Sequence, residues 1–172
     1  MTVKRRTWAE GDKQPFWLAL VAVMALMLVY WFGLPYSFAF DPNAEQCLPD
    51  LHLALLVNHK PAKVADGDLL FWKPSGALSY VKTQHVLKLV AGAPGDHLVI
   101  RNGVVSINGK PVVSGFPLAR EFYHSTPEQF EKDEIIPAGK YFLIGTHQNS
   151  DDSRYWGYLD ASDIVGSGHK VF

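Results

Sequence analysis

The stretch that decides the fold is "VLKLVAGAPGDHLVIRNG", residues 86–103. Two short apolar runs are joined here by a Pro-Gly-Asp turn, and an Asn-Gly pair follows the second run. Apolar runs bounded by such turn residues predict antiparallel strands. A single lysine, Lys88, stands among leucines and valines in the first run. Lysine is rarely fully buried, so a strand that looks buried and contains one requires an explanation.

The chain after the first 40 residues continues this β pattern. It has no βαβ alternation and no internal repeat, and turn residues separate its apolar runs. One short helix is predicted from Thr126, with Pro127 at the first helical position and Gln129 completing a capping box. The rest of 111–134 is predicted to be an excursion without a strand. The fold class is therefore mainly β, an irregular sheet or barrel, with strands expected at 68–72, 86–92, 97–100, 104–107, 140–145 and 163–172.

An uncharged segment, residues 14–40, precedes this β-rich part. About 20 apolar residues suffice to cross a bilayer as a helix, so we expect a transmembrane helix over 15–35. The predicted organisation is a cytoplasmic tail at 1–14, the helix, and an extracytoplasmic domain at 36–172. The alternative is a cleaved signal peptide, but its apolar region would be shorter and would end in small residues.

The charges on either side of the apolar segment predict its orientation. Four basic residues precede the segment, whereas Asp41 and Glu45 follow it. The positive-inside rule then places the N-terminus in the cytoplasm and the domain outside. In a Gram-negative bacterium this corresponds to a single-pass inner-membrane protein with a periplasmic domain.

The composition limits the classes of function. The net charge is −1 at pH 7, and no basic block beyond the first residues predicts nucleic-acid binding. The seven histidines form no metal-type pair, so neither a metal nor another cofactor is expected. Cys47 is the one cysteine in the sequence, so an internal disulfide is impossible and a thiol-exchange cycle would lack a resolving partner.

The surroundings of Lys88 point to acid–base chemistry. Burial disfavours the charged form of an amine, and a neutral amine is a general base that can activate a hydroxyl or a thiol. The alternative is an edge strand from which the lysine faces solvent.

Three segments favour the chemical interpretation. They are "GDLLFWKP" at 67–74, "KLVAGAPGD" at 88–96 and "GTHQNSDDSRYWGYLDASDIVG" at 145–166. In order and spacing they resemble motifs of the type I signal peptidase family, whose members are serine peptidases with a Ser–Lys dyad. The last motif is the most specific; after a one-residue deletion, the matching residues are Asn149, Ser150, Asp152, Ser153, Arg154, Tyr155, Trp156 and Gly157.

The resemblance implies roles for individual residues. Lys88 would be the general base, and Ser150 would orient its amine by a hydrogen bond. Asp152 would pair with Arg154 and hold that wall of the site. The family's nucleophile lies just after the membrane span, and there Cys47 takes the place of serine in a Ser-x-Pro pattern similar to that of the short TraF-type conjugative branch.

Two further residues, besides Cys47, depart from the family pattern. Glu45 occupies a position that often supplies a hydroxyl to the oxyanion hole, and an ionised carboxylate cannot donate a hydrogen bond. The backbone N–H of Cys47 would remain as a donor. Leu51 replaces a glycine of the TraF-type pattern, which affects the substrate groove.

The resemblance implies an endopeptidase that cuts exported precursor proteins at the outer face of the membrane. The precursor would bind as an extended peptide along a sheet edge. The short chain and the Cys-Leu-Pro sequence favour the conjugation branch, with pilin or another component of a type IV secretion apparatus as substrate and other secretion proteins as partners. Membrane lipid would surround the helix. A housekeeping signal peptidase and a catalytically inactive, peptidase-fold assembly factor are the alternatives.

Overall fold

The computed structural model describes residues 14–33, 35–40 and 47–171. The chain divides into two compact units, residues 1–35 and 36–172. The first unit contains α1 (Gln14–Gly33), a 20-residue helix whose described side chains are all exposed.

Part of the expectation for the first unit is met. A helix is found where the sequence predicted one. Within the described residues, however, no helix reaches the combination of length and hydropathy required of a membrane span.

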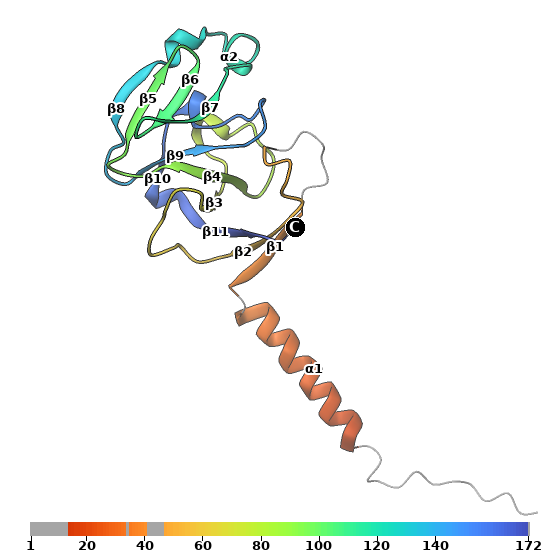
Figure 1. Ribbon diagram of the computed structural model, residues 1–172. Helices are drawn as coiled ribbons and strands as arrows, with labels where there is room; N and C mark the ends of the chain where they lie inside the picture. The colour runs from red at the N-terminus through yellow and green to blue at the C-terminus, as the bar shows by residue number, and fades with distance from the viewer. Residues whose placement is uncertain (1–13, 34, 41–46, 172) are drawn as a thin grey trace, which may run out of the picture. The chain divides into compact units, whose positions relative to one another are not determined.

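The second unit is built on a seven-stranded sheet with the order β1-β2-β11-β3-β4-β9-β10 (Figure 1). Every neighbouring pair in it is antiparallel. Strands that are distant in sequence therefore become neighbours, as β11 does between β2 and β3. The strands are β1 (Tyr36–Phe40), β2 (Leu53–Val57), β3 (Leu69–Trp72), β4 (Val86–Gly92), β9 (Lys140–Ile144), β10 (Leu159–Asp160) and β11 (Ile164–Lys170).

A four-stranded antiparallel sheet, β7-β6-β5-β8, completes the β structure (Figure 1). Its two hairpins turn at Asn-Gly pairs in which all four residues have positive φ, with Asn102 and Asn108 both at 51°. Asparagine and glycine tolerate this left-handed conformation, which two-residue hairpin turns require. The strands are β5 (His97–Arg101), β6 (Val104–Ile107), β7 (Lys110–Ser114) and β8 (Lys132–Ile135).

Short helical turns connect the strands. The predicted helix after Thr126 is a single 3-10 turn, η3 (Pro127–Phe130), and the Gln129 side chain accepts a hydrogen bond from the Thr126 N–H at 3.4 Å. The others are η2 (Gly76–Leu78), α2 (Leu118–Glu121), α3 (Ser153–Trp156) and η4 (Ala161–Asp163).

The mainly β prediction is confirmed, with two corrections. Neither sheet closes into a barrel within the described residues: β1 pairs with β2 alone and β10 with β9 alone. The absence of strands from 111–134 was wrong, because β7 and β8 enter this range at its two ends. Both lie on the edges of the small sheet, where solvent covers much of the strand, so they lack the apolar alternation by which a strand is recognised.

Apolar side chains pack on both faces of the large sheet. In β9, the adjacent residues Phe142 and Leu143 are both buried but belong to different core clusters. Successive side chains of a strand point to opposite faces, so each cluster covers one face. One cluster also contains Leu98 and Ile100 of β5, and thus joins the two sheets. Each fully buried leucine or phenylalanine contributes about 1.5–3 kcal/mol.

Candidate active site

Lys88 lies inside the large sheet. Its strand, β4, is flanked by β3 and β9, and Lys88 itself pairs with Leu70. Only 1% of its surface is exposed. The alternative of a solvent-facing lysine on an edge strand is therefore wrong.

The partner of the buried Lys88 amine is a hydroxyl rather than a carboxylate. Its Nζ donates to Ser150 Oγ at 3.0 Å. No salt bridge found among the described residues includes Lys88. Among the described residues, the amine is thus held by a hydroxyl rather than by a carboxylate.

Cys47 is linked to the loop that contains Ser150. The Cys47 carbonyl accepts a hydrogen bond from His147 N at 3.1 Å. A Cβ at Gly145 would lie 2.5 Å from the same carbonyl oxygen and would also collide with Ser150 Oγ. Glycine at 145 therefore lets the backbone of Cys47 and the side chain of Ser150 approach the same point.

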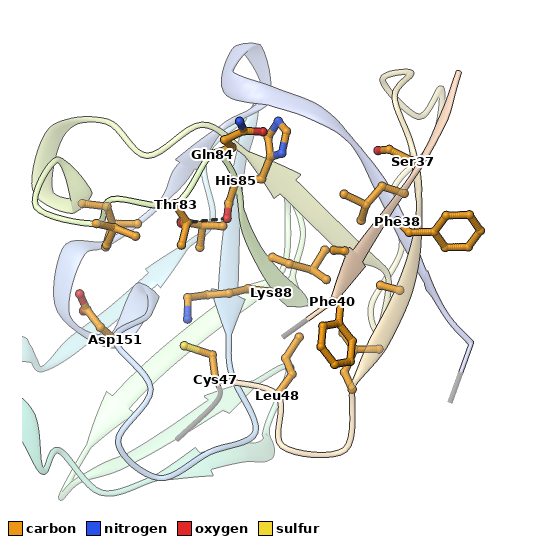
Figure 2. Close-up of a pocket in the computed structure, with 18 of the residues that line it drawn as sticks. Ser37, Phe38, Phe40, Cys47, Leu48, Thr83, Gln84, His85, Lys88 and Asp151 are labelled. Carbon is orange, nitrogen blue, oxygen red and sulfur yellow. Dashed lines mark hydrogen bonds between the residues drawn. The ribbon is translucent and has the colours of Figure 1, made fainter. Parts of the chain in front are cut away.

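Cys47 and Lys88 line one cleft of about 700 Å³. Figure 2 shows the thiol and the amine turned toward each other, although one comes from the segment before β2 and the other from β4. The cysteine is partly exposed and lines this cleft. The cleft is otherwise lined by residues of β1 (37–40), of the segment 48–56 and of the segment 78–87, and by Asp151.

An ion pair fixes the loop beyond Ser150. Arg154 Nε lies 2.8 Å from Asp152 Oδ1 and Nη2 lies 3.0 Å from Oδ2, and both side chains are fully buried. Asp152 also caps α3 by accepting a hydrogen bond from the Arg154 N–H. Arg154 Nη2 donates to the Ser150 carbonyl at 3.0 Å, and Asp152 accepts from Gly145 N at 3.1 Å. The ion pair therefore holds the backbone on both sides of the lysine's hydroxyl partner.

The structure adds residues that the sequence analysis did not single out. Asp151, in the cleft, accepts hydrogen bonds from the hydroxyls of Tyr80 and Tyr123, the latter at 2.6 Å. Burial and the bond to Asp151 raise the pKa of both tyrosines above its ordinary value. The sequence held a signal for Asp151, which stands between two predicted site residues, but none for tyrosines from separate loops.

Two further expectations concern Glu45 and a metal site. Glu45, assigned to the oxyanion region, lies outside the described residues. Across the described ranges, no group of three or more His, Cys, Asp or Glu side chains is placed to hold a metal ion.

Comparison with known proteins identifies the class. Residues 13–172 match the signal peptidase family, peptidase S26. Since the match covers nearly the whole chain, the protein belongs to this family of peptide hydrolases, and the family prediction is confirmed.

Several relatives are signal peptidases by name. The chain is 28% identical over 163 residues to probable signal peptidase I-1 of Synechocystis, covering 90% of this chain and 78% of that protein. It is 29% identical over 170 residues to probable signal peptidase I-2 of the same organism, covering 96% and 73%. With signal peptidase I of Leptolyngbya laminosa it shares 30% identity over 104 residues, 58% of this chain and about half, 48%, of that protein.

Among solved structures, a signal peptidase I from Enterococcus faecalis is similar at 25% identity. The match covers 61% of this chain and 96% of that chain, with a TM-score of 0.39.

Proposed function

We propose that this protein is a membrane-anchored endopeptidase of the signal peptidase type, with Cys47 as nucleophile and Lys88 as general base. One observation carries the proposal: a buried amine, bonded to a hydroxyl, faces a thiol across a cleft that a peptide can enter. A nucleophile within reach of a base that is itself oriented by a third group is the arrangement of covalent catalysis.

The first half of the reaction would form a thioester. Lys88 Nζ takes the proton of the Cys47 thiol, and the sulfur attacks the carbonyl carbon of the scissile peptide bond. The C–N bond then breaks, and the ammonium of Lys88 gives its proton to the departing amine. The new N-terminus leaves, and the precursor's other part stays attached to Cys47.

The second half would release the acyl group. A water molecule enters the cleft and loses a proton to the neutral Lys88 as its oxygen attacks the thioester carbonyl. The C–S bond breaks, the thiolate recovers the proton from Lys88, and the product leaves with a new carboxylate. No cofactor is needed for either half.

The neighbouring residues would support this cycle. Ser150 Oγ, 3.0 Å from Nζ, holds the amine in position. Asp152 and Arg154 fix the loop that carries this hydroxyl. The backbone N–H of Cys47 would donate to the developing oxyanion. Because one oxyanion donor is worth about 10²–10³ in rate, a missing hydroxyl would make this a slow enzyme.

The substrate would be an exported precursor bound as an extended peptide. The cleft is lined largely by apolar side chains, and strand β1 forms one of its walls. A strand with an unpaired edge can bind peptide backbone by hydrogen bonds. The Cys-Leu-Pro sequence at 47–49 supports a role in conjugation, with a pilin precursor or another type IV secretion component as substrate.

The location we propose follows from the charges at the N-terminus. The uncharged segment 14–40 supplies a helix, α1, with exposed apolar side chains, and basic residues precede it. We place this helix in the bacterial inner membrane, the N-terminus in the cytoplasm and the domain in the periplasm.

The test is cleavage of a precursor by the full chain and four variants. Cys47→Ala and Lys88→Ala should each lower the cleavage rate by at least about 10³-fold, because neither half-reaction proceeds without its reacting group. Cys47→Ser should retain measurable cleavage. Lys132→Ala is the matched control, because this lysine is half-exposed and pairs with Glu134 on the small sheet.

Survival of cleavage in both alanine variants would rule out the proposed dyad. If conjugation persists with Cys47→Ala and fails only when the whole gene is deleted, the protein is an assembly factor rather than a peptidase.

A further inference from the structure

The loop 150–152 directs three successive side chains to different partners. Ser150 turns to Lys88, and Asp152 turns to Arg154. Asp151, between them, lines the cleft and in Figure 2 lies on the other side of the Cys47–Lys88 pair from Phe40 of β1. Asp151 therefore shares the cleft with the reacting groups and has no part in the proposed proton transfers.

The carboxylate of Asp151 is held in a fixed position. Tyr80 donates its hydroxyl to one carboxylate oxygen, and Tyr123 donates to the other at 2.6 Å. Burial and the contact with Asp151 raise the pKa of both tyrosines, so they remain protonated donors throughout the neutral range. Three separate loops thereby hold one carboxylate at the wall of the cleft.

Asp151 and its neighbour Asp152 differ in their partners. Asp152 is paired with Arg154, whereas no salt bridge found in the described part of the chain includes Asp151. Hydroxyl donors orient a carboxylate but leave its charge in place. A peptide in the cleft therefore meets a carboxylate that two hydroxyls hold in place, in the same cleft as the thiol.

We infer that Asp151 is a specificity-determining residue that selects precursors with a basic side chain close to the scissile bond and disfavours acidic ones. The inference rests on the proposed function, since it assigns a substrate class to the same cleft. Asp151 is partly exposed, so its interaction with a lysine is comparable to a surface or half-buried ion pair. Such a pair is worth about 1 kcal/mol, or roughly 5-fold in affinity.

The experiment measures binding separately from cleavage. The full chain with Cys47→Ala, in detergent micelles, is titrated with fluorescein-labelled peptides of alanine and leucine. Each peptide has a single Lys, Gln or Glu at one position, and the position is moved along the series. Binding is read by fluorescence anisotropy in that protein, in Cys47→Ala with Asp151→Asn, and in Cys47→Ala with Asp133→Asn. The last is the control, because Asp133 lies on β8 and pairs with His97 and Arg101.

At the most sensitive position we expect Lys peptides to bind about 5-fold more tightly than Gln peptides, and Glu peptides to bind more weakly than both. Asp151→Asn should abolish this order, Asp133→Asn should preserve it, and raising the salt concentration should weaken it. An order that survives Asp151→Asn would overturn the inference, and so would the absence of any charge preference or of any binding.

Cleavage of the same peptides by the chain with Cys47 intact then tests the proposed function by itself. Selective binding without cleavage would contradict the peptidase and leave the role of Asp151 in recognition standing. Cleavage at rates that do not depend on the charge of the peptide would support the peptidase and contradict the role of Asp151 in recognition.

Discussion

The chemistry of a lysine depends on where its amine lies, and this domain contains both extremes. Lys132 and Lys140 lie on the surface and pair with Glu134 at 3.4 Å and Asp160 at 2.6 Å. Exposed pairs of this kind contribute about 0–1 kcal/mol to stability. Lys88 is buried and is bonded to a hydroxyl. In the reaction we propose, the amine that takes the proton of the thiol is the buried one.

At the residue scale we predict that Ser150→Ala slows the reaction without unfolding the protein. Ser150 Oγ is the hydrogen-bond partner of Nζ, and in the proposed reaction the amine becomes charged when it takes the thiol proton. Hydrogen bonds to a charged group are worth about 1.5–3 kcal/mol. We therefore expect kcat to fall about 10- to 100-fold, with KM little changed, in a steady-state assay. Ser162→Ala is the control, because this serine lies in η4 and its hydroxyl contacts only Asp163 among the described residues. Equal kcat for Ser150→Ala and the native chain would contradict the role given to Ser150.

At the scale of elements, the loop from β9 to α3 brings the site together. Its backbone is held by Arg154, which donates to the Ser150 carbonyl, and by Asp152, which accepts from Gly145 N. Because Gly145 has no side chain, the Cys47 carbonyl can approach its backbone closely. The loop thus contacts both the segment that contains Cys47 and, through Ser150, the amine of Lys88 on β4.

The prediction at this scale concerns the buried ion pair. Arg154→Met leaves Asp152 as a buried, unpaired charge, so it should lower the free energy of unfolding by about 3–5 kcal/mol, measured by denaturant titration. The double variant Asp152→Asn with Arg154→Met removes the charge but keeps a side-chain oxygen to cap α3, so it should lose less. A double variant that is less stable than the single one would show that the charge of Asp152 is not the cause.

At the scale of the whole molecule, the chain consists of two compact units. Residues 36–172 contain both sheets and all three core clusters. The candidate site residues that the structure describes, Cys47, Lys88, Ser150, Asp152 and Arg154, also lie in this unit. Since a unit with its own core can fold alone, the reaction should not require residues 1–35.

We therefore predict that residues 36–172, expressed alone, unfold in a single cooperative thermal transition followed by circular dichroism. This shortened protein should cleave a soluble peptide at a rate within about 3-fold of the full chain, since the reacting groups are unchanged. In cell fractionation it should leave the membrane fraction, where the full chain is expected. Membrane association without residues 1–35 would show that the anchor lies elsewhere.

Local patterns in the sequence were enough to predict much of this structure. Asn102-Gly103 and Asn108-Gly109 set two hairpins because these residues accept positive φ, a property of the residues themselves. Lys88 was recognised because a lone amine among apolar neighbours departs from the expected pattern, and Ser150, Asp152 and Arg154 because they stand in one short motif. Strands β7 and β8 were missed, since edge strands do not require apolar alternation.

By itself, the sequence determined the β class, the turns, the family and the identity of the unusual amine, because each of these is encoded within a few adjacent residues. Only the tertiary structure decided that Lys88 lies inside a sheet, that Cys47 faces it, and that Tyr80 and Tyr123 hold Asp151 at the same cleft. These contacts join segments that are 28 to 71 residues apart. Such contacts arise from the pairing of distant strands, which no local pattern specifies.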